Sequence, residues 1–139
     1  MAGLLSHLGL GAVGFLIIYL SFYKSKRITK IVYGGVFIMG NILPDLVDFG
    51  FLSIKMGSLN PDKIMGNPLF HNLALLGHTF SNWIILALIV IAIAGVFYGL
   101  GKISRQAFIG VIVCAVLVLI GILLHLRFDV LIQERSHWI

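Results

Sequence analysis

The side chains best suited to chemistry in this sequence are its histidines and aspartates, which are few and widely spaced. Imidazole and carboxylate groups are ordinary ligands of zinc and other divalent ions. His125 and Asp129 are four residues apart, so they share one face if that segment is a helix. Asp45 and Asp48 are three residues apart and would also share a helical face. These residue types at these spacings indicate a divalent metal site with ligands from several segments.

The segments that must position these residues are strongly apolar. Hydrophobic residues make up 60% of the 139-residue chain and charged residues 11%, whereas a soluble domain carries about 25% charged residues. A helix needs about 20 apolar residues to cross a bilayer. The apolar runs that reach or approach this length are residues 4–22, 28–43, 80–100 and 106–126. We therefore predict one all-α domain over residues 1–139, a four-transmembrane-helix bundle integral to a cell membrane.

The connection between the second and third runs contains all the prolines of the chain. We expect the second run to end before Pro44, and residues 45–54 to form a short helix or loop at the membrane interface. The remainder up to Asn67 is expected to be loop. Asn67 followed by Pro68 is typical of a helix N-cap with proline at the first helical position. A helix starting there could continue into the third run, with a break at Gly77.

The distribution of basic residues predicts the orientation of the bundle. Two short basic loops, after the first run and between the third and fourth, contain Lys24, Lys26, Arg27, Lys30, Lys102 and Arg105, and neither contains an acidic residue. With four spans they all lie on one side, which the positive-inside tendency makes cytoplasmic. Both termini and the long connection are then extracytoplasmic. No basic cluster is dense enough to indicate nucleic acid as a partner. Membrane lipid is the expected partner, and a homo-oligomer or a larger membrane complex is left open.

The same orientation places most of the rare polar residues at one end of the bundle. The residues predicted to gather there are His7, Asp45, Asp48, His78, His125 and Asp129. Ionisable residues near membrane depth are costly and usually functional. We predict that a divalent metal, with zinc as first choice, binds His7, Asp45, His78, His125 and Asp129. Asp48 is the expected catalytic residue, acting as general base.

His71 and His78 cannot easily bind the same ion from one straight helix. They are seven residues apart, which corresponds to about 10.5 Å along a helix axis. Either the helix breaks at Gly77, or two ions are bound, or only one of the two histidines is a ligand. We favour His78, which is closer to the third run, and keep His71 as an additional candidate.

Four short motifs follow one another along the chain: His7-Leu8, Leu43-Pro44-Asp45 with Asp48, His71 with Gly77-His78-Thr79 and Ser81, and His125-Leu126 with Asp129-Val130-Leu131. Their order resembles a family of small membrane-bound proteins, some of them LexA-regulated, that are described as metal-dependent hydrolases. The family tends to have Leu-Pro-Asp-x-Asp, so Asp48 lies one position later here. It also tends to have His-Arg-Gly-x-Thr-His-Ser, whereas Asn72 follows His71. The chain therefore resembles a divergent member of this family.

The resemblance implies a metal-dependent hydrolase, and the interfacial site favours a lipid or lipid-linked (phospho)ester as substrate. The alternative is a non-enzymatic membrane protein or accessory subunit, whose His/Asp cluster is a structural metal site or polar network. Transport is disfavoured because residues 84–96 and 109–124 contain no polar side chain that could line a path through the membrane.

Overall fold

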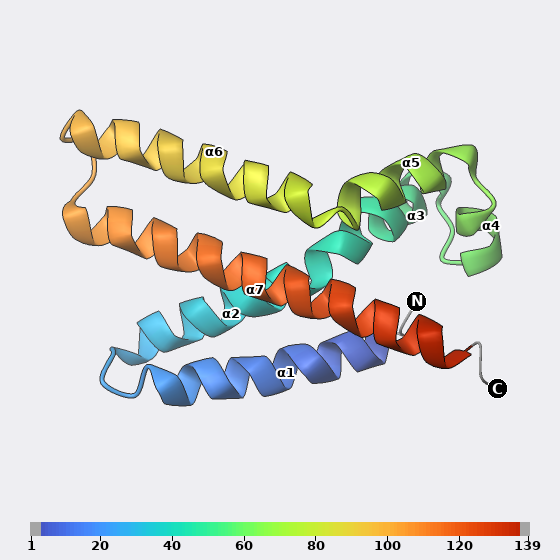
Figure 1. Ribbon diagram of the computed structural model, residues 1–139, viewed down its shortest axis with the longest axis horizontal. Coiled ribbons are helices and arrows are strands. Elements are labelled where there is room, and N and C mark those ends of the chain that lie inside the picture. Colours follow the sequence, from blue (N-terminus) through green and yellow to red (C-terminus); the bar gives the residue numbers. More distant parts are fainter. Residues whose placement is uncertain (1–3, 137–139) are drawn as a thin grey trace.

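The computed structural model describes the backbone of residues 4–136 and the side chains of residues 8–131, except that of residue 61. Helices occupy most of this range and no strand occurs within it, so the all-α prediction is confirmed. The helices, shown in Figure 1, are α1 (Leu4–Ser21), α2 (Arg27–Asp45), the π-helical turn η1 (Leu46–Gly50), α3 (Phe51–Met56), α4 (Pro61–Met65), α5 (Pro68–Gly77), α6 (Phe80–Gly99) and α7 (Arg105–Ser136).

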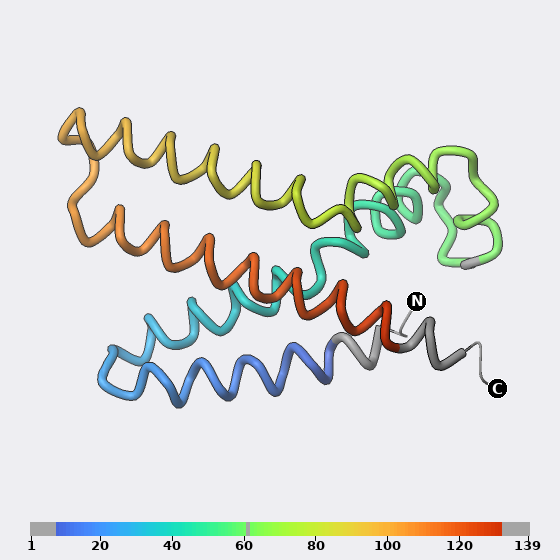
Figure 2. The backbone as a smooth tube through the Cα atoms, in the orientation of Figure 1, coloured from blue at the N-terminus to red at the C-terminus, as the bar shows by residue number. Residues whose placement is uncertain are grey.

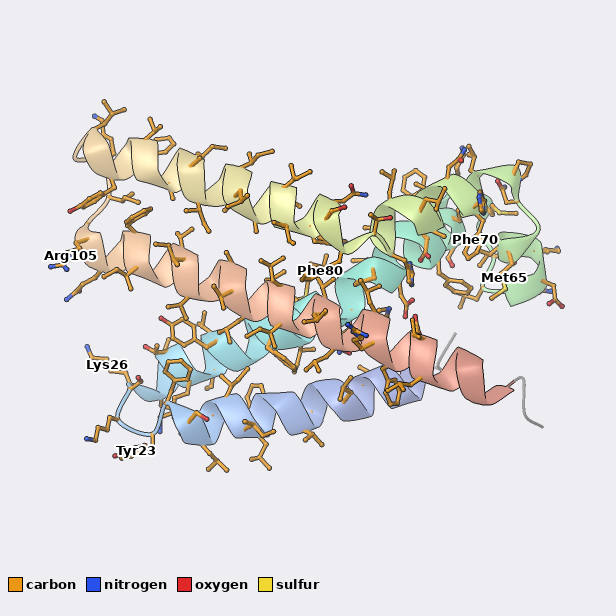
Figure 3. The ribbon with its side chains drawn as sticks, in the orientation of Figure 1. Tyr23, Lys26, Met65, Phe70, Phe80 and Arg105 are labelled. Carbon is orange, nitrogen blue, oxygen red and sulfur yellow. The ribbon has the colours of Figure 1, made fainter. Side chains whose placement is uncertain are left out.

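Four long helices run side by side in alternating directions. The α1–α2 turn and the α6–α7 turn lie at one end of the bundle, while α3, α4 and α5 lie at the other end (Figures 1 and 2). Helix α2 packs against both α1 and α7, and α7 also packs against α6. Lys26 and Arg105 mark the two turns at the same end in Figure 3. The structure thus places both basic turns on one side, as the sequence predicts.

Three helical segments among the described residues are long and apolar enough to cross a membrane: Arg27–Met56, Phe80–Gly99 and Arg105–Leu131. The part of α1 with described side chains, Leu8–Ser21, is apolar but shorter than a span. These lengths and compositions are compatible with an integral membrane protein. The fourth predicted span, residues 4–22, is not confirmed as one.

The second helix does not end before Pro44, contrary to the prediction. Helices α2 and α3 are joined through η1 into one helical segment, Arg27–Met56, with Pro44 inside it. Proline in a helix removes one backbone donor and crowds the preceding turn. The π-turn that begins two residues later loosens the helix locally, and such turns are frequent at kinks and functional sites. The predicted interfacial helix after Pro44 is therefore a continuation of α2 rather than a separate element.

The start and end of α5 follow the sequence signals. The Asn67 side chain accepts a hydrogen bond from the backbone N–H of Leu69, and the helix ends at Gly77. Trp83 in α6 donates a hydrogen bond from Nε1 to the carbonyl of Gly77 over 2.7 Å, which anchors the junction between the two helices. The expected break at Gly77 is confirmed. The short helix α4 occupies part of the segment expected to be loop.

Close approach of α2 and α7 sets the position of the polar end of the bundle. A Cβ atom at Gly40 or at Gly121 would collide with the backbone of the opposite helix, so only glycine permits this spacing. Between them, the fully buried Asn41 donates from Nδ2 to the carbonyl of Gly121 over 3.4 Å. Asp45 and His125 lie one helical turn beyond this contact on their respective helices. The glycine contact therefore brings these two residues to the same level.

The lengths of α2 and α7 up to these two residues are close to the thickness of the hydrocarbon core of a bilayer. Helix α2 has 19 residues and is about 28 Å long, with Asp45 as its last residue. His125 lies about 30 Å along α7 from Arg105. The hydrocarbon core of a membrane is about 30 Å thick. If the basic turns lie at one membrane surface, Asp45 and His125 lie near the other.

Candidate metal centre

The structure brings four of the predicted ligands together from three separate segments. Asp45 is the last residue of α2, His78 directly follows α5, and His125 and Asp129 lie one turn apart on α7. One ligand atom of each of these residues lies within 4.8 Å of the corresponding atoms of the other three. The break after Gly77 turns the chain at His78. The sequence signals that identify this group are residue type, helical spacing and position near the ends of apolar runs.

The distances in this group resemble the edges of a coordination tetrahedron. His78 Nε2 lies 3.4 Å from Asp129 Oδ2 and 3.8 Å from Asp45 Oδ1. His125 Nε2 lies 3.4 Å from Asp129 Oδ2 and 3.5 Å from Asp45 Oδ1. Zinc binds nitrogen and oxygen ligands at roughly 2.0–2.2 Å, so neighbouring ligand atoms of a tetrahedral site are roughly 3.3–3.6 Å apart. The four side chains could therefore surround one ion with only small adjustments.

The site is closed by the bundle on one side and accessible on the other. His125 is fully buried, whereas the side chains of His78, Asp45 and Asp129 are 25%, 20% and 13% exposed. A cavity of about 350 Å³ covers the exposed side. Its lining consists of Asp48, Phe70, Ala74, His78, Leu126, Asp129 and Val130. A ligand in this cavity would contact one histidine and two carboxylates together with four apolar side chains.

The charges of the group favour a cation at its centre. Neighbouring carboxylates repel each other strongly where water is scarce. Asp45 Oδ1 is buried and accepts no hydrogen bond of ordinary geometry from the described residues. The hydrogen bond with Asp129 raises the pKa of His78, and the nearby charge of Asp48 acts in the same direction, although burial opposes both. A proton on histidine or a divalent ion could supply the positive charge that the carboxylates attract.

Asp48 contacts the opposite edge of the His78 ring. Its Oδ2 atom lies 3.3 Å from Nδ1 of His78, and its Oδ1 atom accepts a hydrogen bond from the backbone N–H of Phe49. The Asp48 side chain is completely buried. Metal-binding histidines usually donate their second ring N–H to a carboxylate or carbonyl, which fixes the ring orientation. The contact with Asp48 leaves Nε2 of His78 facing the other three ligands.

Asp48→Asn is expected to weaken metal binding about 10- to 100-fold, because the neutral amide no longer stabilises the orientation and basicity of His78. Affinity can be measured by competition with a chromophoric zinc chelator. Asp62→Asn, which changes an exposed carboxylate on α4, is the matched control and should bind zinc like the wild type. Equal affinity of Asp48→Asn and the wild type would contradict the orienting role.

The remaining predicted residues lie elsewhere or outside the described part. His71 is exposed on α5 and does not belong to the group of four. The backbone of His7 lies in α1, but its side chain is outside the described residues, so its predicted ligand role is not placed. The general-base role of Asp48 also stays a prediction. The structure therefore places His78 rather than His71 beside the other candidate ligands.

Asn41 is a buried polar residue of this region that we did not predict from the sequence. It lies four residues before Asp45 on α2, one helical turn from the group of four candidate ligands. Its Nδ2 atom contacts the carbonyl of Gly121, while Oδ1 is buried with no hydrogen-bond partner among the described residues. The sequence does contain a signal for this residue: Asn41 is an amide within an apolar run, and it lies four residues before the candidate ligand Asp45, on the same helical face.

Comparisons of this chain with protein-family models, curated proteins and solved structures gave no match. The motif resemblance to membrane-bound hydrolases therefore stays an expectation. Any assignment of function depends on the geometry of the site itself.

Proposed function

We propose that this chain is a membrane-embedded, metal-dependent hydrolase that acts on a lipid or lipid-linked (phospho)ester at the extracytoplasmic face. The observation that carries this proposal is the compact group of His78, His125, Asp45 and Asp129 beneath a cavity. Two imidazoles and two carboxylates suit zinc, which is the ion we propose. The level of the group near one edge of the bilayer favours a substrate with a head group at the membrane surface.

The proposed topology has four spans, with α1 as the first. Helix α1 runs alongside α2 in the opposite direction, and both basic turns lie at the same end of the bundle (Figure 1). The positive-inside tendency would place that end in the cytoplasm. The metal centre and both termini would then be extracytoplasmic.

The proposed chemistry assigns distinct tasks to the residues of the site. A zinc ion held by four side chains would have to expand its shell to take up a water, whose pKa it would then lower while polarising the scissile group. His78, His125, Asp45 and Asp129 would hold the ion. Asp48 lines the cavity but is not one of these four ligands. We therefore propose that its carboxylate accepts a proton from water, in addition to orienting His78.

A structural metal site is the second candidate. Four protein ligands would fill a tetrahedral shell, and closed shells are typical of structural zinc sites, whereas catalytic sites keep an open position. The chain would then be a non-enzymatic membrane protein or an accessory subunit. The accessible cavity that His78 and Asp129 line favours the hydrolase over this alternative.

Turnover by zinc-loaded protein tests the proposed function. Purified protein would be incubated in micelles with phosphatidic acid, phosphatidylglycerol and a polyprenyl pyrophosphate, and the released products would be measured. We expect turnover that a chelator removes and zinc restores. Asp48→Asn should lower the rate by about 10²–10⁴-fold at saturating zinc, because a general base is lost.

Asp62→Asn should keep the wild-type rate in the same assay. Helix content by circular dichroism shows whether each variant is folded. A protein that binds one zinc ion, hydrolyses none of these lipids and loses its helical structure on chelation would establish the structural site instead.

A further inference from the structure

A second cavity, of about 560 Å³, lies between α2, α6 and α7. We define the apolar groove by six of its lining residues: Leu43, Trp83, Ala107, Gly110, Cys114 and Val118. None of its lining residues carries a charge. Small residues on α7 leave the space open, and a Cβ atom added at Gly110 would have no neighbour within 4 Å.

The apolar groove lies at membrane depth and borders the lipid-facing surface. All of α6 and most of α7 belong to segments long enough to span a bilayer. Leu86 and Val90 also line the groove, and they are 50% and 45% exposed. Because the exposed surface of these helices would face hydrocarbon chains, the groove would open to lipid.

One face of α7 connects the groove with the metal centre. Ala107, Gly110, Cys114 and Val118 recur every three or four residues and therefore form one stripe. The same periodicity, continued for two to three turns beyond Val118, leads to residues 126 and 129, which line the cavity beside the metal centre. A single surface of α7 thus forms one wall of both cavities.

The other two helices bring the groove close to the site. Leu43 lies two residues before Asp45 on α2. Trp83 donates a hydrogen bond to the carbonyl of Gly77, the residue that precedes His78. From this end the groove extends along α7 from Val118 to Ala107, about 16 Å. Its long direction follows the helices, as lipid tails do in a bilayer.

We propose that the apolar groove binds the hydrocarbon tail of the lipid whose head group reaches the metal centre. The inference deepens the proposed function, since it depends on that function for the role of the head group. A tail that moves from the bilayer into the groove exchanges one apolar environment for another, so hydrophobic transfer contributes little. Selection must therefore come from the shape and length of the groove. Substitutions that place a larger side chain in the groove should therefore exclude the tail.

Fluorescence of Trp83 can report tail binding without any turnover. The chain has two tryptophans, so Trp138→Phe leaves Trp83 as the only one. Trp83 is 9% exposed and lines the groove, so bromine atoms that enter the groove would contact its ring. The probe is phosphatidylcholine with brominated stearoyl chains, added to detergent-solubilised protein. Its zwitterionic head group avoids simple attraction to the basic turns.

We expect saturable quenching of Trp83 in the Trp138→Phe protein. Ala87→Phe, which places a ring in the groove, should reduce the quenching at least about tenfold. Gly110→Leu is a second filling variant, built into open space, and should act in the same direction. The matched control is Ala92→Phe, on the same helix but at an exposed position that does not line the groove.

The result that would overturn the inference is quenching that does not saturate, or quenching that is equal in Ala87→Phe, Gly110→Leu and Ala92→Phe. Zinc content, measured in parallel, should be unchanged in all three variants because none alters a metal ligand. Quenching as expected but without lipid hydrolysis would overturn the hydrolase and leave tail binding established. Hydrolysis with unaltered quenching in the filled variants would overturn the groove and leave the hydrolase.

Discussion

His125→Ala is expected to abolish zinc binding, with an affinity loss of more than about 100-fold. Loss of the carboxylate that orients a metal-binding histidine alone costs about 10- to 100-fold, and His125 is the only fully buried residue among the four candidate ligands. Replacing His125 leaves only three candidate ligands, the two carboxylates and His78. Thermal unfolding provides the readout, because a ligand that binds only the folded protein raises the midpoint temperature. We expect zinc to stabilise the wild type and to have no effect on His125→Ala.

His71→Ala is the matched control for this experiment. His71 is exposed on α5 and lies outside the donor group, so its removal should leave the zinc-induced stabilisation unchanged. The comparison also distinguishes the two histidines that the sequence analysis weighed, since His78→Ala should behave like His125→Ala. Undiminished zinc stabilisation of His125→Ala, or its loss in His71→Ala, would contradict the assigned ligands.

Gly40→Leu is expected to disrupt the metal centre without changing any of its residues. A Cβ atom at Gly40 would collide with the backbone carbonyl of Val118, so α2 and α7 must move apart. Overpacking of a close contact typically costs about 1–3 kcal/mol, and backbone atoms cannot turn aside as a flexible side chain can. The separation would pull Asp45 away from His125. We expect lower thermal stability and loss of stoichiometric zinc.

Gly35→Leu on the same helix is the control for the loss of a glycine. A Cβ atom at Gly35 has no neighbour within 4 Å, and leucine favours the helix more than glycine does. This variant should keep wild-type stability and zinc content, both measured on monodisperse protein after gel filtration. Full zinc binding by Gly40→Leu would show that the close contact does not position the ligands.

Much of the site could be predicted because helical periodicity and membrane thickness are both regular. The i,i+4 spacing of His125 and Asp129 required only that α7 continue beyond the apolar run, which it does. The position of Asp45 near the end of a membrane-spanning length of helix followed from the length of the second run. Asn67 and Pro68 marked the start of α5, and the small residue Gly77 marked its end.

The course of the chain around Pro44 could not be predicted from local rules. Proline usually ends or kinks a helix, yet here the helical segment continues past Pro44 through a π-turn. Pro44 is buried, and a Cβ atom at Gly77 would lie 2.8 Å from its carbonyl oxygen, so α5 closes over this turn. The π-turn that follows contains Asp48 and brings it to Nδ1 of His78. Sequence spacing alone predicted a shared face for the two aspartates, but not their separate contacts on one imidazole ring.

Asn41 shows a second limit of sequence reasoning. An isolated amide in an apolar run indicates a polar contact, but its partner depends on which helix faces it. That partner is the backbone of Gly121, and no side-chain pattern on α7 marks it. The predicted number of spans has a similar limit. Helix α1 is apolar, but its described part is shorter than a membrane span, so the fourth span is not confirmed.

Zinc content and ligand geometry of the purified protein test the metal centre most directly. Elemental analysis combined with X-ray absorption should show one divalent ion per chain, bound by nitrogen and oxygen ligands at roughly 2.0–2.2 Å. Chains reconstituted with zinc and then dialysed should retain the ion. Protein without a stoichiometric divalent ion after reconstitution, or an ion bound through the sulfur of Cys114, would contradict a centre formed by His78, His125, Asp45 and Asp129.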